Sequence, residues 1–175
     1  MFKKISYVAI ALFLSACASQ APTPVIIAPK ATNTQDLMSV NKIDVIDLRK
    51  NPALAIINGK NMPINNDLIP NLKSWLNRSL DTNPYGSKTI TFNILSYASY
   101  VKQETVSFTL ESVMEWQVQV DSDSKVWKKS FQSTIKEEGP LIADNSIVEK
   151  HLNKLAETLL DRSVKDHDFQ QAVFN

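Results

Sequence analysis

The clearest pattern in the chain is an alternation of apolar and polar residues between Val106 and Asp121. Every even-numbered position except Ser112 is apolar, and most odd-numbered positions are polar. Because successive side chains of a strand point to opposite faces, this predicts a long strand with one buried and one solvent-facing side. Asp121-Ser122-Asp123-Ser124 predicts a turn, and 126–135 a returning hairpin strand that Gly139-Pro140 ends.

Two segments show the period of amphipathic helices. The first runs from Asn66 or Asp67 to about Leu80, with Asp67 as the expected N-cap, and the second from Asn145 or Ser146 to Val164. Ser146 and Glu149 have the spacing of a capping box. The apolar stripe of the second helix comprises Ile147, Val148, Leu152, Leu155, Ala156, Leu159, Leu160 and Val164. The tail from Asp166 is expected to add one short turn, with Phe169, Val173 and Phe174 contacting the domain.

Shorter apolar runs predict further strands at 40–49, 53–57 and 90–97. In the last run the apolar phase changes between Ile94 and Leu95, which indicates a bulge or a strand buried on both faces. With the helices, the order is β, β, α, β, β, β, α. The pattern therefore predicts an α+β fold, with one mainly antiparallel sheet and two helices packed on one face.

The first residues have the character of a signal peptide. Lys3 and Lys4 precede an apolar run, Tyr7 to Leu14, that is much shorter than the about 20 residues of a membrane-spanning helix. Leu14-Ser15-Ala16-Cys17 resembles the lipobox of bacterial lipoproteins. That resemblance implies cleavage between Ala16 and Cys17 and a lipidated cysteine as the first mature residue. The alternative, in which Cys17 is a small residue of an ordinary secretory signal, leaves the single cysteine of the chain without a role.

The segments around Cys17 divide the chain into three parts. Residues 1–16 are the expected signal peptide, 17–40 a lipidated flexible tether containing three prolines, and 41–175 a single periplasmic domain. Fully extended, the tether would reach about 75 Å. Val25-Ile26-Ile27 interrupts it and either docks on the domain as a short strand or stays free. Because Ala18 rather than an aspartate follows the cysteine, the lipoprotein resemblance implies the periplasmic face of the outer membrane.

Composition argues against several functions. The net charge of +1 gives no basic surface for nucleic acid. One cysteine and two separated histidines, His151 and His167, do not favour a metal site, and both histidines are expected to be solvated. The three glycines are dispersed at predicted turns, so no phosphate-binding loop or other cofactor site is expected. Glu111 and Glu115 share a strand face and are interpreted as a solvent-facing row rather than a catalytic pair.

Aromatic residues are few. Trp75, Trp116 and Trp127 fall on apolar faces and are expected in the core, whereas Tyr97 and Tyr100 are candidates for exposure.

As a whole the chain resembles the YajG-like family of outer-membrane lipoproteins. The matching features are the MFKK start, the lipobox ending at Cys17, the proline-bearing tether, a strand ending in Asp47-x-Arg49, and the closing helix with Leu159-Leu160-Asp161. The expected function is a non-enzymatic accessory that binds an envelope protein through a sheet face or strand edge. The alternative is a carrier for an amphipathic ligand such as lipid or lipopolysaccharide, which requires an apolar cavity. Whether Asp47 and Arg49 act beyond structure stays open.

Overall fold

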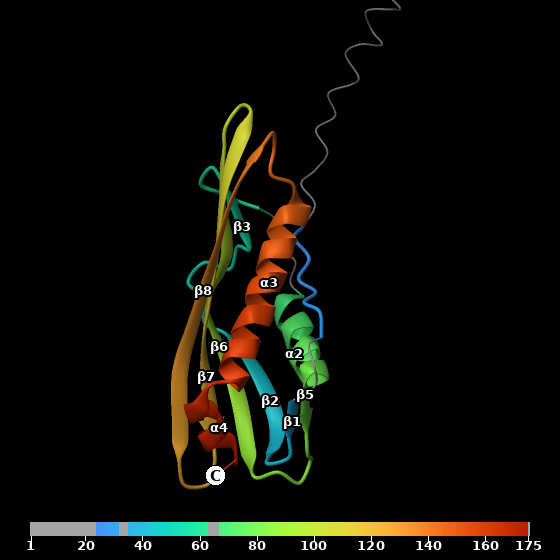
Figure 1. The fold of residues 1–175 in the computed structure, drawn as a ribbon, viewed down its shortest axis with the longest axis vertical. Coiled ribbons are helices and arrows are strands. Elements are labelled where there is room, and N and C mark those ends of the chain that lie inside the picture. The colour runs from blue at the N-terminus through green and yellow to red at the C-terminus, as the bar shows by residue number, and fades with distance from the viewer. Residues whose placement is uncertain (1–23, 32–34, 63–66, 175) are drawn as a thin grey trace, which may run out of the picture.

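The computed structural model describes residues 24–31, 35–62 and 67–174, so Ala16 and Cys17 lie outside the described part. Its main element is a six-stranded sheet, shown in Figure 1. The strands are β2 (Val40–Asp47), β3 (Ala55–Ile57), β4 (Lys60–Asn61), β6 (Lys88–Gln103), β7 (Ser107–Asp121) and β8 (Val126–Pro140). A second, two-stranded sheet pairs β1 (Gln35–Leu37) with β5 (Leu80–Thr82) in parallel.

The central strand of the main sheet is β6. Along one edge it pairs with β7, and β7 pairs with β8, both antiparallel. Along the other edge, the first half of β6 pairs with β2 and its last residues pair with β3, both parallel. The three long strands make the sheet mainly antiparallel, as predicted, and the two shorter strands are the parallel exceptions.

The predicted phase change in β6 is a β-bulge. The register with β7 shifts between Ile94 and Ser96, so Leu95 is the additional residue. The two residues of the turn at Asn58-Gly59 have positive φ angles of 46° and 77°. Such angles suit asparagine and glycine in a tight hairpin, here the one between β3 and β4.

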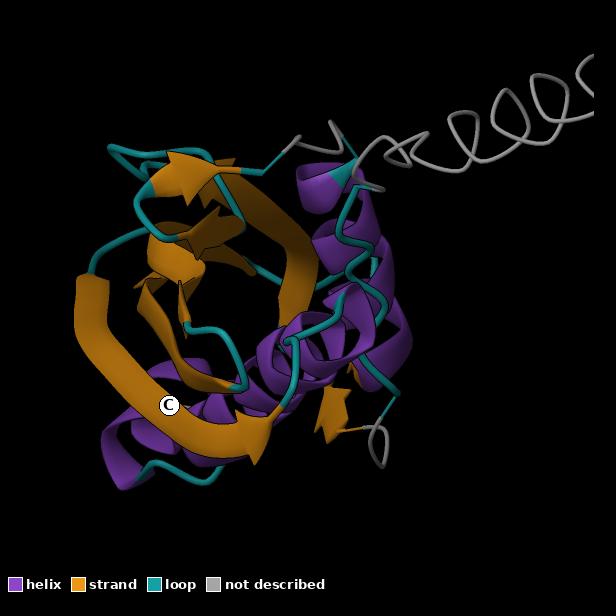
Figure 2. Ribbon diagram, turned by 90° about the horizontal axis from the view of Figure 1, so that it is seen from above, coloured by secondary structure: helices purple, strands orange, loops and turns teal. Residues whose placement is uncertain are grey.

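Three helices lie on one face of the sheet: α2 (Leu68–Ser79), α3 (Asn145–Val164) and α4 (His167–Phe174). Figure 2 shows them along one side of the strongly curved sheet. The third helix, α4, replaces the single turn expected from the sequence. Phe169 and Val173 are buried as expected, whereas Phe174 is exposed. Within the described ranges, no helix combines the length and the apolar character needed to cross a membrane.

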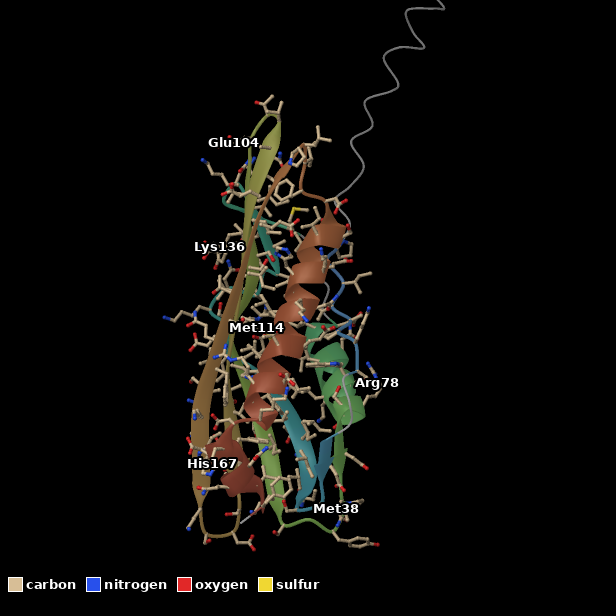
Figure 3. All side chains as sticks on the ribbon, in the orientation of Figure 1. Met38, Arg78, Glu104, Met114, Lys136 and His167 are labelled. Atoms are coloured by element: carbon tan, nitrogen blue, oxygen red, sulfur yellow. The ribbon has the colours of Figure 1, made fainter. Side chains whose placement is uncertain are left out.

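The core fills the space between the sheet and the helices. The even-numbered side chains of β7 from Phe108 to Val120 point inward and are buried, as the alternation predicts. Figure 3 shows Met114 between the sheet and α3. The Trp116 ring packs edge-on against Phe92, with 4.8 Å between ring centroids, and its Nε1 donates to the Ser163 hydroxyl. The buried aromatic and aliphatic groups thus lock the two layers together.

The helix N-termini differ from the predictions. Asp144, not Ser146, is the N-cap of α3, and its carboxylate accepts from the Ile147 N–H at 3.1 Å. The Ser146 hydroxyl donates to the Asp144 carboxylate, so the predicted capping box with Glu149 is wrong. Asp67 occupies the N-cap position of α2, but its side chain makes no capping hydrogen bond.

Candidate functional site

The extended residues Pro24 to Ala31, here called the N-terminal strap, run along α3. The backbone N–H groups of alternate strap residues donate to polar side chains spaced four residues apart on the helix. The three bonds are Ile26 to Glu149 at 2.8 Å, Ala28 to Asn153 at 2.9 Å and Lys30 to Glu157 at 2.9 Å. The intervening side chains, Val25 and Ile27, are buried.

The spacings of the strap and the helix match. Four residues of an α-helix advance about 6.0 Å, and two residues of an extended chain advance about 6.2 to 6.8 Å. A ladder of three bonds therefore forms without distortion. On the other side of the strap, the indole N–H of Trp75 in α2 donates to the Lys30 carbonyl at 2.8 Å. The strap thus connects α2 to α3.

The strap corrects the predicted boundary of the tether. Val25 and Ile27 are 1% and 2% exposed, and Leu37 and Val40 are fully buried, although all four lie in the segment 17–40 assigned to a flexible tether. Within the described residues, the folded part therefore includes 24–31 and 35–40 and not only the segment from residue 41. Val25-Ile26-Ile27 does dock on the domain, but as an extended segment along α3 and not as the predicted short strand.

Asp47 and Arg49 form a clamp on the bulge of β6. The Arg49 guanidinium donates two parallel hydrogen bonds to the Asp47 carboxylate, at 2.9 and 2.8 Å, and a third to the Tyr97 carbonyl at 3.2 Å. The Arg49 hydrogen bonds hold the pKa of Asp47 below its ordinary value. The Arg49 side chain is only 4% exposed, and its hydrogen bonds go to Asp47 and Tyr97. The Asp-x-Arg motif therefore joins the end of β2 to β6.

The two candidate exposed tyrosines differ. Tyr97 is 1% exposed, its hydroxyl donates to the Leu152 carbonyl at 2.9 Å, and burial raises its pKa. The prediction of an exposed Tyr97 is therefore wrong. Tyr100 is exposed, as expected.

A buried polar chain crosses from the sheet to α3. The hydroxyls of Ser99 and Ser112 are 2.6 Å apart, Ser112 lies 3.4 Å from Nδ1 of His151, and Nε2 of His151 lies 2.7 Å from Glu137. The expectation of a solvated His151 is wrong, because this side chain is buried. His167, by contrast, is exposed.

The order serine, histidine, carboxylate resembles a hydrolytic triad, but the geometry does not suit one. Ser99 and Ser112 are both fully buried, so a substrate carbonyl cannot reach either hydroxyl. The Ser112–His151 distance is also at the limit of a hydrogen bond. The contacts among these side chains instead give buried polar groups their hydrogen-bond partners between the two layers of the fold.

The sheet face opposite the helices is polar. Glu111 and Glu115 lie there, as predicted, and Glu111 pairs with Lys136 of the neighbouring strand at 3.3 Å. The outward side chains of β7 and β8 include Glu111, Val113, Glu115, Gln117, Gln119, Lys128, Ser130, Gln132, Thr134, Lys136 and Glu138. None of the described helices covers this face, so its side chains are available to a partner.

A hollow of about 850 Å³ lies at the end of the molecule formed by the β7–β8 turn and α4. Its lining is mixed: Lys88, Asp123 and Asp168 contribute polar groups, Val120 and Trp127 contribute apolar ones, and it lies outside the layer between sheet and helices. In the part of the chain that the structure describes, no group of three or more His, Cys, Asp or Glu side chains is placed to hold a metal ion.

A family model described as "Uncharacterized lipoprotein" (Lipoprotein_16) matches residues 24–173. The chain belongs to this family. The resemblance to the YajG-like lipoproteins is thereby confirmed, and the matched segment begins at the strap, in agreement with the corrected boundary. Membership of this family indicates that the protein is a membrane-anchored lipoprotein. No curated protein matches the chain.

Two solved structures are similar. A crystal structure titled as an uncharacterized protein is 12% identical, with a TM-score of 0.49, and the match covers 78% of this chain and 99% of that chain. The crystal structure of protein XCC0632 from Xanthomonas campestris, of the family DUF330, is 10% identical, with a TM-score of 0.45, and the match covers 87% of this chain and 91% of that chain.

The functional residues that sequence reasoning missed are the acceptors on α3. Glu149, Asn153 and Glu157 lie on the polar side of the predicted helix, opposite its apolar stripe, and they bind the strap. A signal for them is present in the sequence. Acceptor side chains recur every four residues on the helix, and residues 25–29 form an unbroken apolar run in the strap.

Proposed function

We propose that Cys17 carries the lipid and anchors the protein at the periplasmic face of the outer membrane. The domain serves there as a non-enzymatic module that binds an envelope protein. The observation that carries the binding role is the long sheet face of β6, β7 and β8, which no described helix covers. It offers charges of both signs and amide side chains at regular spacing, which can pair with complementary charges and hydrogen-bonding groups of a protein partner.

The filled core favours this role over that of a carrier. A carrier of lipid or lipopolysaccharide needs an apolar cavity of several hundred Å³ between the helices and the sheet. At that position Phe92, Met114, Trp116 and Leu155 are each fully buried and packed. The burial of Ser99 and Ser112 likewise supports a role without hydrolytic chemistry.

Position-specific photo-crosslinking in intact cells tests the binding role. A photoreactive residue is placed at Gln117 or Thr134, on the sheet face opposite the helices, here called the free face. A matched control is placed at Lys154, which is exposed on α3 on the other side of the molecule. We expect the same light-dependent adduct from both face positions and none from Lys154. Adducts from Lys154 alone, or from no position, would contradict a partner on the sheet face.

A further inference from the structure

Three exposed aliphatic residues meet at one end of the molecule. Val106, Leu141 and Ile142, here called the apical patch, are 70%, 70% and 73% exposed. The Leu141 N–H donates to the Val106 carbonyl at 2.8 Å, which joins the β6–β7 hairpin to the loop between β8 and α3. Both segments lie at the top of Figure 1, and Figure 3 labels Glu104 of the same hairpin.

Gln103 holds these segments together. Its side-chain amide nitrogen lies 2.8 Å from the Leu141 carbonyl and 3.0 Å from the Ser107 carbonyl. Its amide oxygen accepts from the Ala143 N–H at 3.0 Å. The backbone N–H of Gln103 also donates to the Asn58 side chain in the β3–β4 turn, at 2.8 Å. Gln103 thus connects the β6–β7 hairpin, the loop between β8 and α3, and the β3–β4 turn. These bonds hold the residues of the apical patch in fixed positions.

The backbone at the patch is strained. Leu141 has a φ angle of 69°, in the left-handed region that residues other than glycine and asparagine rarely adopt. The conformation persists because the Gln103 bonds determine it, and the leucine side chain that it carries is exposed. Strained backbone that presents an exposed apolar side chain is characteristic of a functional surface.

The strap leads to the same end of the molecule. Ile26 is bonded to Glu149, one turn into α3, and the loop with Leu141 and Ile142 directly precedes that helix. Cys17 precedes Pro24 by seven residues, which can span at most about 25 Å. A lipid on Cys17 therefore keeps this end close to the bilayer. The β7–β8 turn lies the length of a 15-residue strand away, about 50 Å.

We propose that the apical patch contacts the lipid bilayer, an inference that rests on the proposed lipidation of Cys17. Aliphatic side chains at loop tips partition into the region between headgroups and acyl chains. The patch and the lipid together hold the long axis away from the membrane plane and leave the free sheet face open to a partner.

Fluorescence quenching in vesicles tests the contact. The mature lipidated protein carries Ile142→Cys or Val106→Cys, labelled with an environment-sensitive nitrobenzoxadiazole group. The matched control is Val126→Cys, 59% exposed beside the turn at the opposite end. Acylated Cys17 does not react, so each variant has a single label. The vesicles contain phosphatidylethanolamine, phosphatidylglycerol and a spin-labelled quencher lipid.

We expect several-fold stronger quenching at positions 142 and 106 than at position 126. Equal, weak quenching at all three positions in protein that floats with the vesicles would overturn the bilayer contact while leaving the anchor intact. A blue-shifted but unquenched label at position 142 would show that protein, rather than lipid, covers the patch. Mature protein that lacks lipid on Cys17 would overturn both the proposed anchor and the contact, and mass spectrometry of the same sample identifies that case.

Discussion

The backbone N–H of Ile26 donates a hydrogen bond of 2.8 Å to the carboxylate of Glu149, which lies 123 residues further along the chain. This bond is the first rung of the ladder that fixes the strap to α3. It ties the segment nearest the expected lipid to the last long helix of the domain. The position of the proposed anchor is therefore linked to the fold itself and not only to a tether.

Removal of the strap is expected to destabilise the domain. A chain from Ala18 and a chain from Pro24 should show the same urea transition. A chain from Asn41 loses Val25, Ile27, Leu37 and Val40, all buried, and should be less stable by more than about 3 kcal/mol. This loss is not expected from the assignment of residues 17–40 to a flexible tether. Coincident transitions for the chains from Ala18 and Asn41 would support that assignment.

Asp47→Asn is expected to lower the free energy of unfolding by about 1 to 3 kcal/mol at neutral pH, because it leaves the buried Arg49 guanidinium without its counter-ion. The pKa of Asp47 is lowered in the folded state. Its stabilisation is thus complete above the unfolded pKa of about 4 and is lost as the pH falls through the lower, folded pKa. Denaturant titrations of both proteins should therefore converge in acid. A gap that persists unchanged below that range would contradict the clamp.

Trp116→Ala is expected to cost about 3 to 5 kcal/mol in urea unfolding, because it removes a fully buried indole and its contact with Phe92. Trp127→Ala is the matched control. Trp127 is only half-buried and packs against Phe169 at one end of the core, so its removal should cost less. A loss under about 1 kcal/mol for Trp116→Ala would reverse the assignment of the inward face of β7.

Ser112→Ala is expected to affect stability and not catalysis. The substitution removes a partner of Ser99 and His151 in a buried chain, which should cost about 1 to 3 kcal/mol. With a chromogenic ester, the purified protein and the variant should both hydrolyse at the rate of buffer. Ester hydrolysis by the protein that disappears in Ser112→Ala would show that the chain Ser112–His151–Glu137 is catalytic.

The elements with long, unbroken periods could be predicted from the sequence. The faces of β7, the stripe of α3 and the bulge at Leu95 follow from local spacing alone, and the structure confirms all three. Each depends on residues close in sequence, whose pattern determines which face becomes buried.

The features that the sequence did not predict depend on contacts between distant segments. The parallel pairing of β2 with β6 needs a crossover that period-2 patterns do not specify. His151 sits beside the apolar stripe, and its burial follows from Glu137 of β8 approaching its ring. The apical patch is likewise set by Gln103, a polar residue at a strand end whose four loop contacts have no local signature.

The lipid on Cys17 is the central claim, and intact mass spectrometry of the protein extracted from envelopes tests it most directly. We predict a chain that begins at Cys17 and carries the mass of a diacylglycerol, with label from a supplied fatty acid and recovery in the outer-membrane fraction. Cys17→Ala should lose the label and leave that fraction while the folded domain keeps its urea transition. An unlipidated chain with another N-terminus, or a Cys17→Ala protein still labelled in the outer membrane, would contradict the account.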